Sequence, residues 1–246
     1  MSEEKISMTR NNSMLLFCGD IHGEFKKLIW TLTNKVAGPE ISEISVVVAG
    51  DFGVGFGRPK AIEVLYNSVK QKLEKYNITV YVVRGNHDNP EYFDGNHNFE
   101  RLIFLEDHKP IEILGKIIYP IGGAHSVDKD WRIEANKEAI EYGSSKRWWW
   151  EGEKITEKYK NLPDKVDIIV SHEAPLSFEP VIVRETEDEE MWENIISSRK
   201  YLDHILLEVR AKWWIHGHYH KTTSGSYKDI KYRGLNIDEL FEIPTE

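Results

Sequence analysis

The sequence predicts an α/β fold in which helices cover the faces of a β-sheet. Two observations predict it. Short apolar runs of β-type residues alternate with segments whose apolar residues recur every three or four positions, as on one face of a helix. Glycine-rich polar turns follow several of the apolar runs. In α/β folds ligands bind at the carboxyl ends of the strands, so these turns are where we expect a site.

The first ninety residues contain three units in which a strand ends in such a turn. The predicted strands are 15–18, 45–49 and 80–83. Apolar residues at helical spacing follow the first two strands, over 25–32 and 62–73. Pro59 lies near the start of the second predicted helix, where the fixed φ of proline is tolerated.

Further elements follow in the second half of the chain. Apolar runs at 103–105, 111–114 and 117–121 are predicted to be antiparallel additions to the sheet. The opening pattern then returns, with a strand at 167–170, a helix through 202–209 and a strand at 213–215.

Two stretches interrupt the alternation. One, about 126–161, carries Trp131 and the run Trp148–Trp150; the other, 178–192, carries the acidic run Glu185–Glu190. Neither resembles a separate domain, so we expect a single domain over residues 1–246 with two insertions near the mouth of the site. The tryptophans have two interpretations, a surface that holds a base or apolar group, or packing of the insertion. The acidic run is interpreted as a solvated face.

Composition limits the class of protein. The formal net charge of −9 disfavours nonspecific coating of nucleic acid or anionic membrane. No stretch approaches the ~20 apolar residues of a membrane span, and the polar start is unlike a signal peptide. Cys18 is the only cysteine, which excludes an internal disulfide, and Glu24 stands where a thiolate phosphatase loop needs arginine. We therefore expect a soluble cytoplasmic protein in which Cys18 is a buried strand residue.

Side chains with metal-binding chemistry follow five of the predicted strands. Asp20 and His22 lie one residue apart in a turn flanked by glycine, which lets a carboxylate and an imidazole reach one cation. Asp51 follows the second strand, and its two oxygens can each bind a different ion of a pair ~3.5–4 Å apart. The other potential ligands are Asn86, His172, His218 and His220.

Each of these residues also has an ordinary structural interpretation, because an Asp after a strand commonly forms a turn or caps a helix. Their combination is harder to explain in that way. The pattern Gly-Asp-x-His-Gly alone is expected about once in a thousand chains of this length. Here Gly-Asp, Gly-Asn-His-Asp and Gly-His-x-His follow it in order, each after an apolar run. The set therefore indicates a functional site.

The motifs resemble those of the calcineurin-like metallophosphoesterase superfamily. They are Gly19-Asp20-Ile21-His22, Gly50-Asp51, Gly85-Asn86-His87-Asp88, His172 and Gly217-His218-Tyr219-His220. The resemblance implies a four-layer sandwich of two mixed β-sheets flanked by helices, with two divalent metal ions at the sheet ends. It assigns Asp20, His22 and His220 to one ion, Asn86, His172 and His218 to the other, and Asp51 to both. Mn²⁺ is the first choice of ion, with Fe, Zn or Ni as alternatives.

The charges predict a mechanism of phosphate-ester hydrolysis. Two cations that share a water lower its pKa toward neutrality and place a hydroxide for in-line attack on phosphorus. His87 is the expected general acid that protonates the leaving oxygen, and Asp88 is expected to orient its imidazole. Arg84 matches a position that holds the substrate phosphate in some members of the superfamily.

The sequence leaves the substrate open between phosphate monoesters and diesters. The serine/threonine protein phosphatases continue their second motif to Asp-Arg-Gly, whereas here Phe52-Gly53-Val54-Gly55-Phe56-Gly57-Arg58 follows Asp51. A protein phosphatase or a nuclease on the same metals is therefore an alternative. A non-catalytic binding module is a further alternative, and the presence of all the expected ligands and of His87 argues against it. We expect a phosphate-ester substrate and no membrane partner; the sequence does not determine the oligomeric state.

Overall fold

The side chains of the central strands point alternately to two apolar layers, and this alternation builds two stacked sheets. Along the first strand, Leu16 and Cys18 pack toward one cluster while Phe17, between them, packs toward another. The next strand does the same, with Val46 in the first cluster and Val47 in the second. The cluster that contains Phe17 and Val47 also contains residues of the second sheet, so it is the layer between the sheets.

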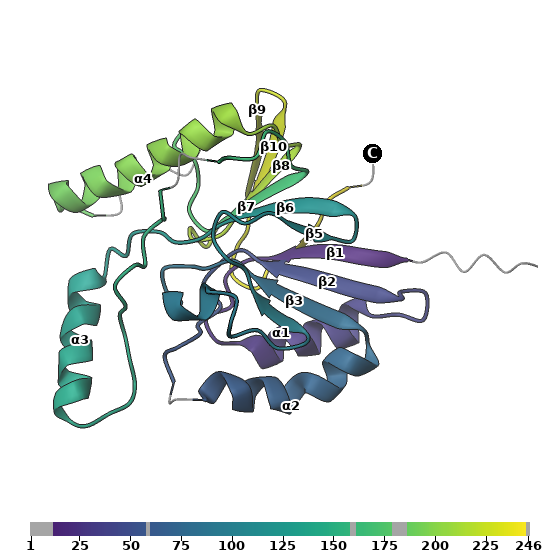
Figure 1. Ribbon diagram of the computed structural model, residues 1–246, viewed down its shortest axis with the longest axis horizontal. Coiled ribbons are helices and arrows are strands. Elements are labelled where there is room, and N and C mark those ends of the chain that lie inside the picture. Colours follow the sequence, from purple (N-terminus) through teal and green to yellow (C-terminus); the bar gives the residue numbers. More distant parts are fainter. Residues whose placement is uncertain (1–11, 58–59, 158–160, 179–185, 245–246) are drawn as a thin grey trace, which may run out of the picture.

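The computed structural model describes residues 12–57, 60–157, 161–178 and 186–244. Its two sheets have the strand orders β11-β1-β2-β3-β4 and β5-β6-β7-β8-β10-β9 (Figure 1). The first sheet consists of β11 (Leu240–Glu242), β1 (Ser13–Cys18), β2 (Glu43–Val48), β3 (Ile78–Val82) and β4 (Leu102–Phe104). The second consists of β5 (Ile111–Ile113), β6 (Lys116–Ile121), β7 (Ile168–Ser171), β8 (Trp213–His216), β10 (Ile230–Gly234) and β9 (Thr223–Tyr227).

Helices cover the outer faces of both sheets. On the first sheet lie α1 (Phe25–Thr31), which a π-helical turn (Leu32–Val36) extends, and α2 (Ala61–Lys75). On the second sheet lies α4 (Glu189–Glu208), whose Leu202 and Ile205 pack against Trp214 of β8. The layers are therefore helices, sheet, sheet and helix (Figure 1). The predicted α/β four-layer sandwich is confirmed.

The prediction of an antiparallel addition is wrong for one of the three apolar runs, 103–105, which forms β4. β5 and β6 form an antiparallel hairpin, but β6 pairs in parallel with β7, and β4 pairs in parallel with β3. Between β3 and β4 the chain passes through a 3₁₀ turn (Pro90–Phe93) and returns to the end of the sheet from which β3 started. A crossover of this kind produces a parallel neighbour, whereas a tight turn produces an antiparallel one.

The two expected insertions differ in the structure. Residues 126–161 contain a helix that we did not predict, α3 (Lys129–Glu141), which lies to the side of the sandwich in Figure 1. Of 178–192, residues 179–185 are outside the described part of the chain. Asp188 caps α4 by accepting a hydrogen bond from the Met191 N–H (2.9 Å), and Glu189 begins the helix. Acidic residues are favourable there because the first turn of a helix carries partial positive charge.

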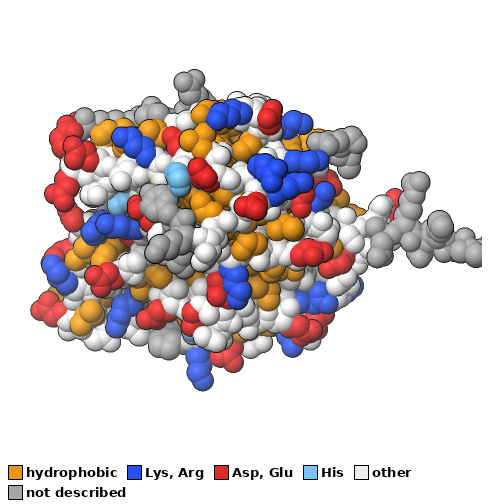
Figure 2. Space-filling view, turned by 45° about the horizontal axis from the view of Figure 1, so that its top comes forward, with side chains coloured by type: hydrophobic (Ala, Val, Ile, Leu, Met, Phe, Trp, Pro, Cys, Tyr) orange, Lys and Arg blue, Asp and Glu red, His pale blue; other side chains and the backbone are white. Residues whose placement is uncertain are grey.

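The helices, the surface and the single cysteine of the described part of the chain bear on the class of protein. None of its helices has the length and apolar character needed to cross a membrane. The face in Figure 2 carries acidic and basic side chains interspersed with apolar ones. Cys18 is fully buried at the end of β1, and burial raises the pKa of its thiol far above the ordinary value, as expected for a structural residue.

Candidate metal centre

Five parallel strands bring the predicted ligands together. Each residue lies in the loop after the carboxyl end of its strand: β1, β2, β3, β7 or β8. These loops approach so closely that two glycines are required. A Cβ on Gly50 would lie 2.1 Å from Nδ1 of His172, and a Cβ on Gly85 would lie 2.1 Å from Oδ1 of Asp51. The glycines of the motifs therefore make room for the neighbouring side chains.

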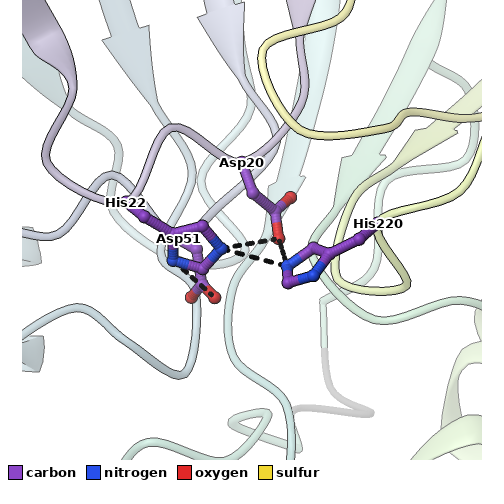
Figure 3. A group of neighbouring side chains, drawn as sticks. All are labelled: Asp20, His22, Asp51 and His220. Atoms are coloured by element: carbon purple, nitrogen blue, oxygen red, sulfur yellow. Dashed lines mark hydrogen bonds and ion pairs between the residues drawn. The ribbon is translucent and has the colours of Figure 1, made fainter.

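The first group of ligands consists of Asp20, His22 and His220 beside Asp51 (Figure 3). Nε2 of His220 lies 3.1 Å from Oδ2 of Asp20 and 3.0 Å from Nε2 of His22. Nδ1 of His22 lies 3.9 Å from Oδ2 of Asp51. Asp20 and Asp51 are buried while both imidazoles are exposed, so the group opens to solvent on the histidine side.

The second group consists of Asn86, His172 and His218. Nε2 of His172 lies 2.8 Å from Oδ1 of Asn86 and 3.3 Å from Oδ1 of Asp51. The ring of His218 packs edge-on against the ring of His172, with 4.9 Å between their centroids. The Nδ1 of His172 lies 2.8 Å from the backbone oxygen of Ala49, so Nδ1 carries the proton and Nε2 faces the site.

Asp51 lies between the two groups and uses a different oxygen toward each. Burial alone would raise the pKa of Asp51, but His172 outweighs it and holds that pKa well below the ordinary value. Burial would likewise lower the pKa of His172, but the carboxylates of Asp51 and Asp20 raise it to about 10. Without a cation, a proton on His172 offsets the charge of the buried carboxylates.

This donor set fits a pair of divalent cations. At Oδ2 of Asp20, which is buried, no donor within the described residues meets hydrogen-bonding geometry. Around Nε2 of His172 the nearest groups are the acceptor oxygens of Asn86 and Asp51, which a positive charge would stabilise. Imidazole, carboxylate and amide oxygen together suit Mn, Fe, Zn or Ni.

Backbone conformation at the site is unusual. Four of the expected ligands have positive φ although none is glycine: His22 (43°), Asp51 (48°), His218 (70°) and His220 (49°). Left-handed backbone costs a residue with a Cβ about 1 kcal/mol or more, and such residues cluster at functional sites. In these turns the backbone is held by hydrogen bonds such as the one from His22 N–H to the Asp51 carbonyl (2.8 Å).

His87 lies at the edge of the site in an aromatic setting. Its ring meets the ring of His22 edge-on, at 5.7 Å between centroids, and lies nearly parallel to that of Phe56, at 6.1 Å. Burial lowers the pKa of His87, although the nearby Asp51 carboxylate acts in the opposite direction. A pocket of about 280 Å³ is lined by His22, Gly23, Gly53, Phe56 and His87.

The tryptophan-rich insertion packs against this aromatic edge. Trp150 meets the Phe56 ring edge-on at 4.8 Å, and Trp148 does so at 6.4 Å. Trp148 also contacts Trp131 and the Lys146 ammonium, which lies 3.9 Å from the ring centroid. Trp148 and Trp150 therefore pack against Phe56, and Phe56 in turn lies beside His87.

Asp88 does not contact the His87 imidazole, contrary to our expectation. Its buried carboxylate accepts hydrogen bonds from four backbone N–H groups. The donors are Phe52, Gly53, Val54 and Gly85, at 2.7–3.2 Å. Burial raises the pKa of Asp88 to about 6, and the charge of Asp51 adds to the rise. Asp88 thus joins the loop after β2 to the loop after β3.

Arg84 is also placed differently from the expectation. Its side chain is buried, and all three nitrogens of the guanidinium donate to acceptors of the protein. Nε and one terminal nitrogen bond the Asp107 carboxylate, at 3.1 and 2.7 Å. The remaining acceptors are backbone oxygens of Gly122, Gly152, Glu153 and Lys154. No N–H group is left for a phosphate, so the position in the motif did not predict the direction of the side chain.

Sequence reasoning missed four buried polar residues around the second group. Ser126, Arg132 and Glu153 come from the insertion and surround Asn86. Glu173 is fully buried, and its Oε2 lies 3.8 Å from Nε2 of His218 with no hydrogen bond from any described residue. Its position directly after His172 is a signal that could have identified Glu173. The other three have no such signal, because they are spread along the chain from Ser126 to Glu153 and follow no motif.

Comparison with known families gives a clear match. The family model of the calcineurin-like phosphoesterases matches residues 14–222, which include every predicted ligand. The chain belongs to the calcineurin-like phosphoesterase family. Calcineurin-like phosphoesterases depend on two metal ions and hydrolyse phosphate esters, and the Asp and His cluster described above is able to bind metal. The predicted resemblance is therefore confirmed at the level of the family and of general phosphoester hydrolysis.

More specific relatives are remote. No curated protein sequence matches this calcineurin-like phosphoesterase. Among solved structures, it is similar to the phosphopantetheinyl hydrolase of Mycobacterium tuberculosis, with 15% identity, a TM-score of 0.48, and coverage of 92% of this chain and 90% of that chain. It is also similar to a protein assigned as a 5′-nucleotidase from Staphylococcus aureus, with 13% identity, a TM-score of 0.36, and coverage of 92% of this chain and 49% of that chain.

Proposed function

We propose that this chain is a two-metal phosphoesterase in which Asp51 is shared by both cations. The supporting observation is the position of its carboxylate, with Oδ2 toward His22 and Oδ1 toward His172. A carboxylate in this position is the usual bridge between cations ~3.5–4 Å apart. One cation would be held by Asp20, His22 and His220, and the other by Asn86, His172 and His218. Mn²⁺ is our first choice of ion, with Fe, Zn or Ni as alternatives.

The cations, when bound, supply water acidified toward neutral pH and neutralise the charge of the phosphate oxygens. The protein orients this pair. His172 directs Nε2 inward because its Nδ1–H is bonded to the Ala49 carbonyl. Asp88 fixes the Asp51 and Asn86 loops relative to one another through its bonds to Phe52 and Gly85. Such fixed geometry is what brings an attacking group in line with the leaving group.

His87 is the proposed general acid for the leaving oxygen. The partly buried imidazole favours the neutral form in the free protein, since burial lowers its pKa. An anionic phosphate ester placed next to it favours the protonated form, because a nearby negative charge raises a histidine pKa. The proton is therefore stabilised on His87 when substrate is present, and transfer to the leaving oxygen releases it.

The aromatic edge of the site favours a particular leaving group. Beside His87 the pocket wall is Phe56, whose ring also contacts the rings of Trp148 and Trp150. A flat apolar or aromatic group is the chemical match for such a wall. Arg84 offers no fork for the terminal oxygens of a monoester dianion. We therefore propose small phosphodiesters or nucleotide-like esters as substrates in preference to phosphoserine peptides, and one catalytic domain over residues 1–246.

The test is a comparison of substrates after metal exchange. Protein stripped by chelation, with metal loss verified by elemental analysis, is reloaded with Mn²⁺, Fe²⁺, Zn²⁺ or Ni²⁺ and assayed on bis-nitrophenyl phosphate, nitrophenyl phosphate and a phosphoserine peptide. We expect no turnover without metal and a diester kcat/KM at least equal to that of the peptide. Full activity of stripped protein would refute the two-metal proposal. A preference for the peptide of about a hundredfold would support the protein phosphatase alternative.

A further inference from the structure

The side-chain amide of Asn86 has two ends of almost the same shape and opposite chemistry. Only the oxygen end can bind a cation, whereas the NH₂ end repels one. Within the described residues, Oδ1 faces Nε2 of His172 at 2.8 Å, and Nδ2 faces the hydroxyl of Ser126 at 2.9 Å. The orientation of this amide depends on what its neighbours donate and accept.

Counting the protons at Ser126 determines that orientation. A serine hydroxyl has one proton to donate and two lone pairs that accept. The Ser126 hydroxyl donates to Oε2 of Glu153 (2.8 Å), whose ion pair with Arg132 favours the charged, acceptor-only carboxylate, and accepts from the Arg132 guanidinium (2.6 Å). It has only an acceptor site left for Asn86. If the amide were reversed, Oδ1 of Asn86 would meet a hydroxyl whose only proton is already used.

Burial makes this arrangement expensive to break. Asn86, Ser126, Arg132 and Glu153 are 1–3% exposed, so water does not supply a replacement partner. Arg132 fixes the group from two sides. It lies 3.3 Å from Oε2 of Glu153 in an ion pair, and it donates to the backbone oxygen of Asn86 at 3.2 Å.

We propose that Ser126, Arg132 and Glu153 are positioning residues that hold the oxygen of Asn86 toward the second cation. The inference rests on the proposed function. All three residues belong to the insertion 126–161, so this part of the chain acts on the metal centre as well as on the aromatic edge. The contacts involve Asn86 and no ligand of the first cation, and the effect is therefore confined to the second cation.

The experiment measures metal binding rather than activity. Metal-free wild-type protein and Ser126→Ala are titrated with Mn²⁺ by calorimetry, and bound metal is counted by elemental analysis after desalting. We expect Ser126→Ala to bind the second Mn²⁺ about 10- to 100-fold more weakly, as is usual for outer-shell partners of ligands, with the first binding step unchanged. Glu134→Gln is the matched control, since Glu134 lies on the same helix as Arg132 and is 64% exposed.

A second variant separates orientation of the amide from general damage to the insertion. Asn86→Asp replaces the two-ended amide by a symmetric carboxylate that presents oxygen in either orientation. In this background Ser126→Ala should change the affinity for the second Mn²⁺ by less than about threefold, because no orientation remains to be held. A loss as large as in the wild-type background would overturn the inference and indicate that Ser126 acts through folding of its loop.

The remaining outcomes separate the positioning role from the proposed function. If wild type binds two Mn²⁺ and Ser126→Ala binds both with unchanged affinity, the positioning role is wrong while the proposed function stands. If wild type binds fewer than two ions with Mn²⁺ and also with Fe²⁺, Zn²⁺ and Ni²⁺, the proposed function fails and the inference fails with it. Circular dichroism and the Tm of the metal-free variants verify that each protein is folded.

Discussion

The carboxylate of Asp51 accepts a hydrogen bond of 2.8 Å from the backbone N–H of His87. The proposed bridging ligand is thereby joined to the residue that carries the proposed general acid. Asp51→Asn should lose at least about 100-fold in kcat/KM, because the bridge loses its charge and one of its oxygens. Bound metal per chain should fall below two by elemental analysis. Asp94→Asn, in an exposed loop, is the control. Retention of both metals and of activity in Asp51→Asn would show that the bridge is misassigned.

His87→Ala should keep both metals and lose roughly 10²–10⁴-fold in rate on esters with poor leaving groups. A nitrophenolate leaving group needs no proton, so the loss on nitrophenyl esters should be much smaller. The measurement is kcat on alkyl and nitrophenyl esters of the same phosphate. Equal losses on the two series would contradict the general-acid role and indicate a role in positioning.

Phe56→Ala should selectively weaken the binding of substrates that carry an aromatic group. Loss of a stacking partner typically reduces affinity about tenfold or more, so KM for an aryl diester should rise by that factor. KM for an alkyl diester with a leaving group of matched pKa should change little. Phe56→Leu keeps an apolar wall without a ring and separates stacking from burial. The same rise for aryl and alkyl esters, with intact metal content, would exclude an aromatic leaving-group site.

Arg84→Met should affect stability and leave the kinetics almost unchanged. The substitution leaves the Asp107 carboxylate, which is largely buried, and several backbone oxygens without their donor. Removing one partner of a buried ion pair costs about 3–5 kcal/mol in the free energy of unfolding. Urea unfolding measures this cost, with the exposed Arg210→Met as control. If KM for phosphate esters rises tenfold while stability is retained, Arg84 binds substrate after all.

His125 predicts a dependence of stability on pH. Its ring is bonded to the Ser198 hydroxyl (3.0 Å), and burial lowers its pKa from 6.5 to about 4. Between these values the unfolded chain binds a proton that the folded chain does not, so stability falls as pH decreases from about 6.5 to 4. His125→Gln should flatten this decrease, measured as urea midpoints of metal-free protein between pH 7.5 and 4.5. Equal slopes for wild type and variant would show that His125 does not titrate in this way.

The strands and turns that carry the motifs were predictable because their signals are local. The run that became β2 is continuously apolar from Val46 to Ala49 and ends at Gly50, and a glycine is needed there because His172 approaches closely. The same local logic gave the loops after β1, β3, β7 and β8. Bringing those loops together required only that parallel strands end at one edge.

Other features depend on partners that are distant in sequence. The three residues of β4 do not indicate whether the strand is parallel or antiparallel to its neighbour, because that depends on how it pairs with β3. α3 buries Arg132 and exposes Trp131, so it has no apolar stripe that would predict a helix. Arg84 matched a motif position, yet its side chain donates hydrogen bonds to acceptors at 107, 122 and 152–154. Such polar networks are visible only in three dimensions.

The left-handed backbone at four expected ligands places function and stability in opposition. Asp or His at a positive φ costs about 1 kcal/mol relative to glycine, which adopts this conformation freely. His22, Asp51, His218 and His220 each carry this cost. A laboratory selection of this protein for heat resistance alone would therefore enrich glycine at these four positions, and its most stable products would be inactive.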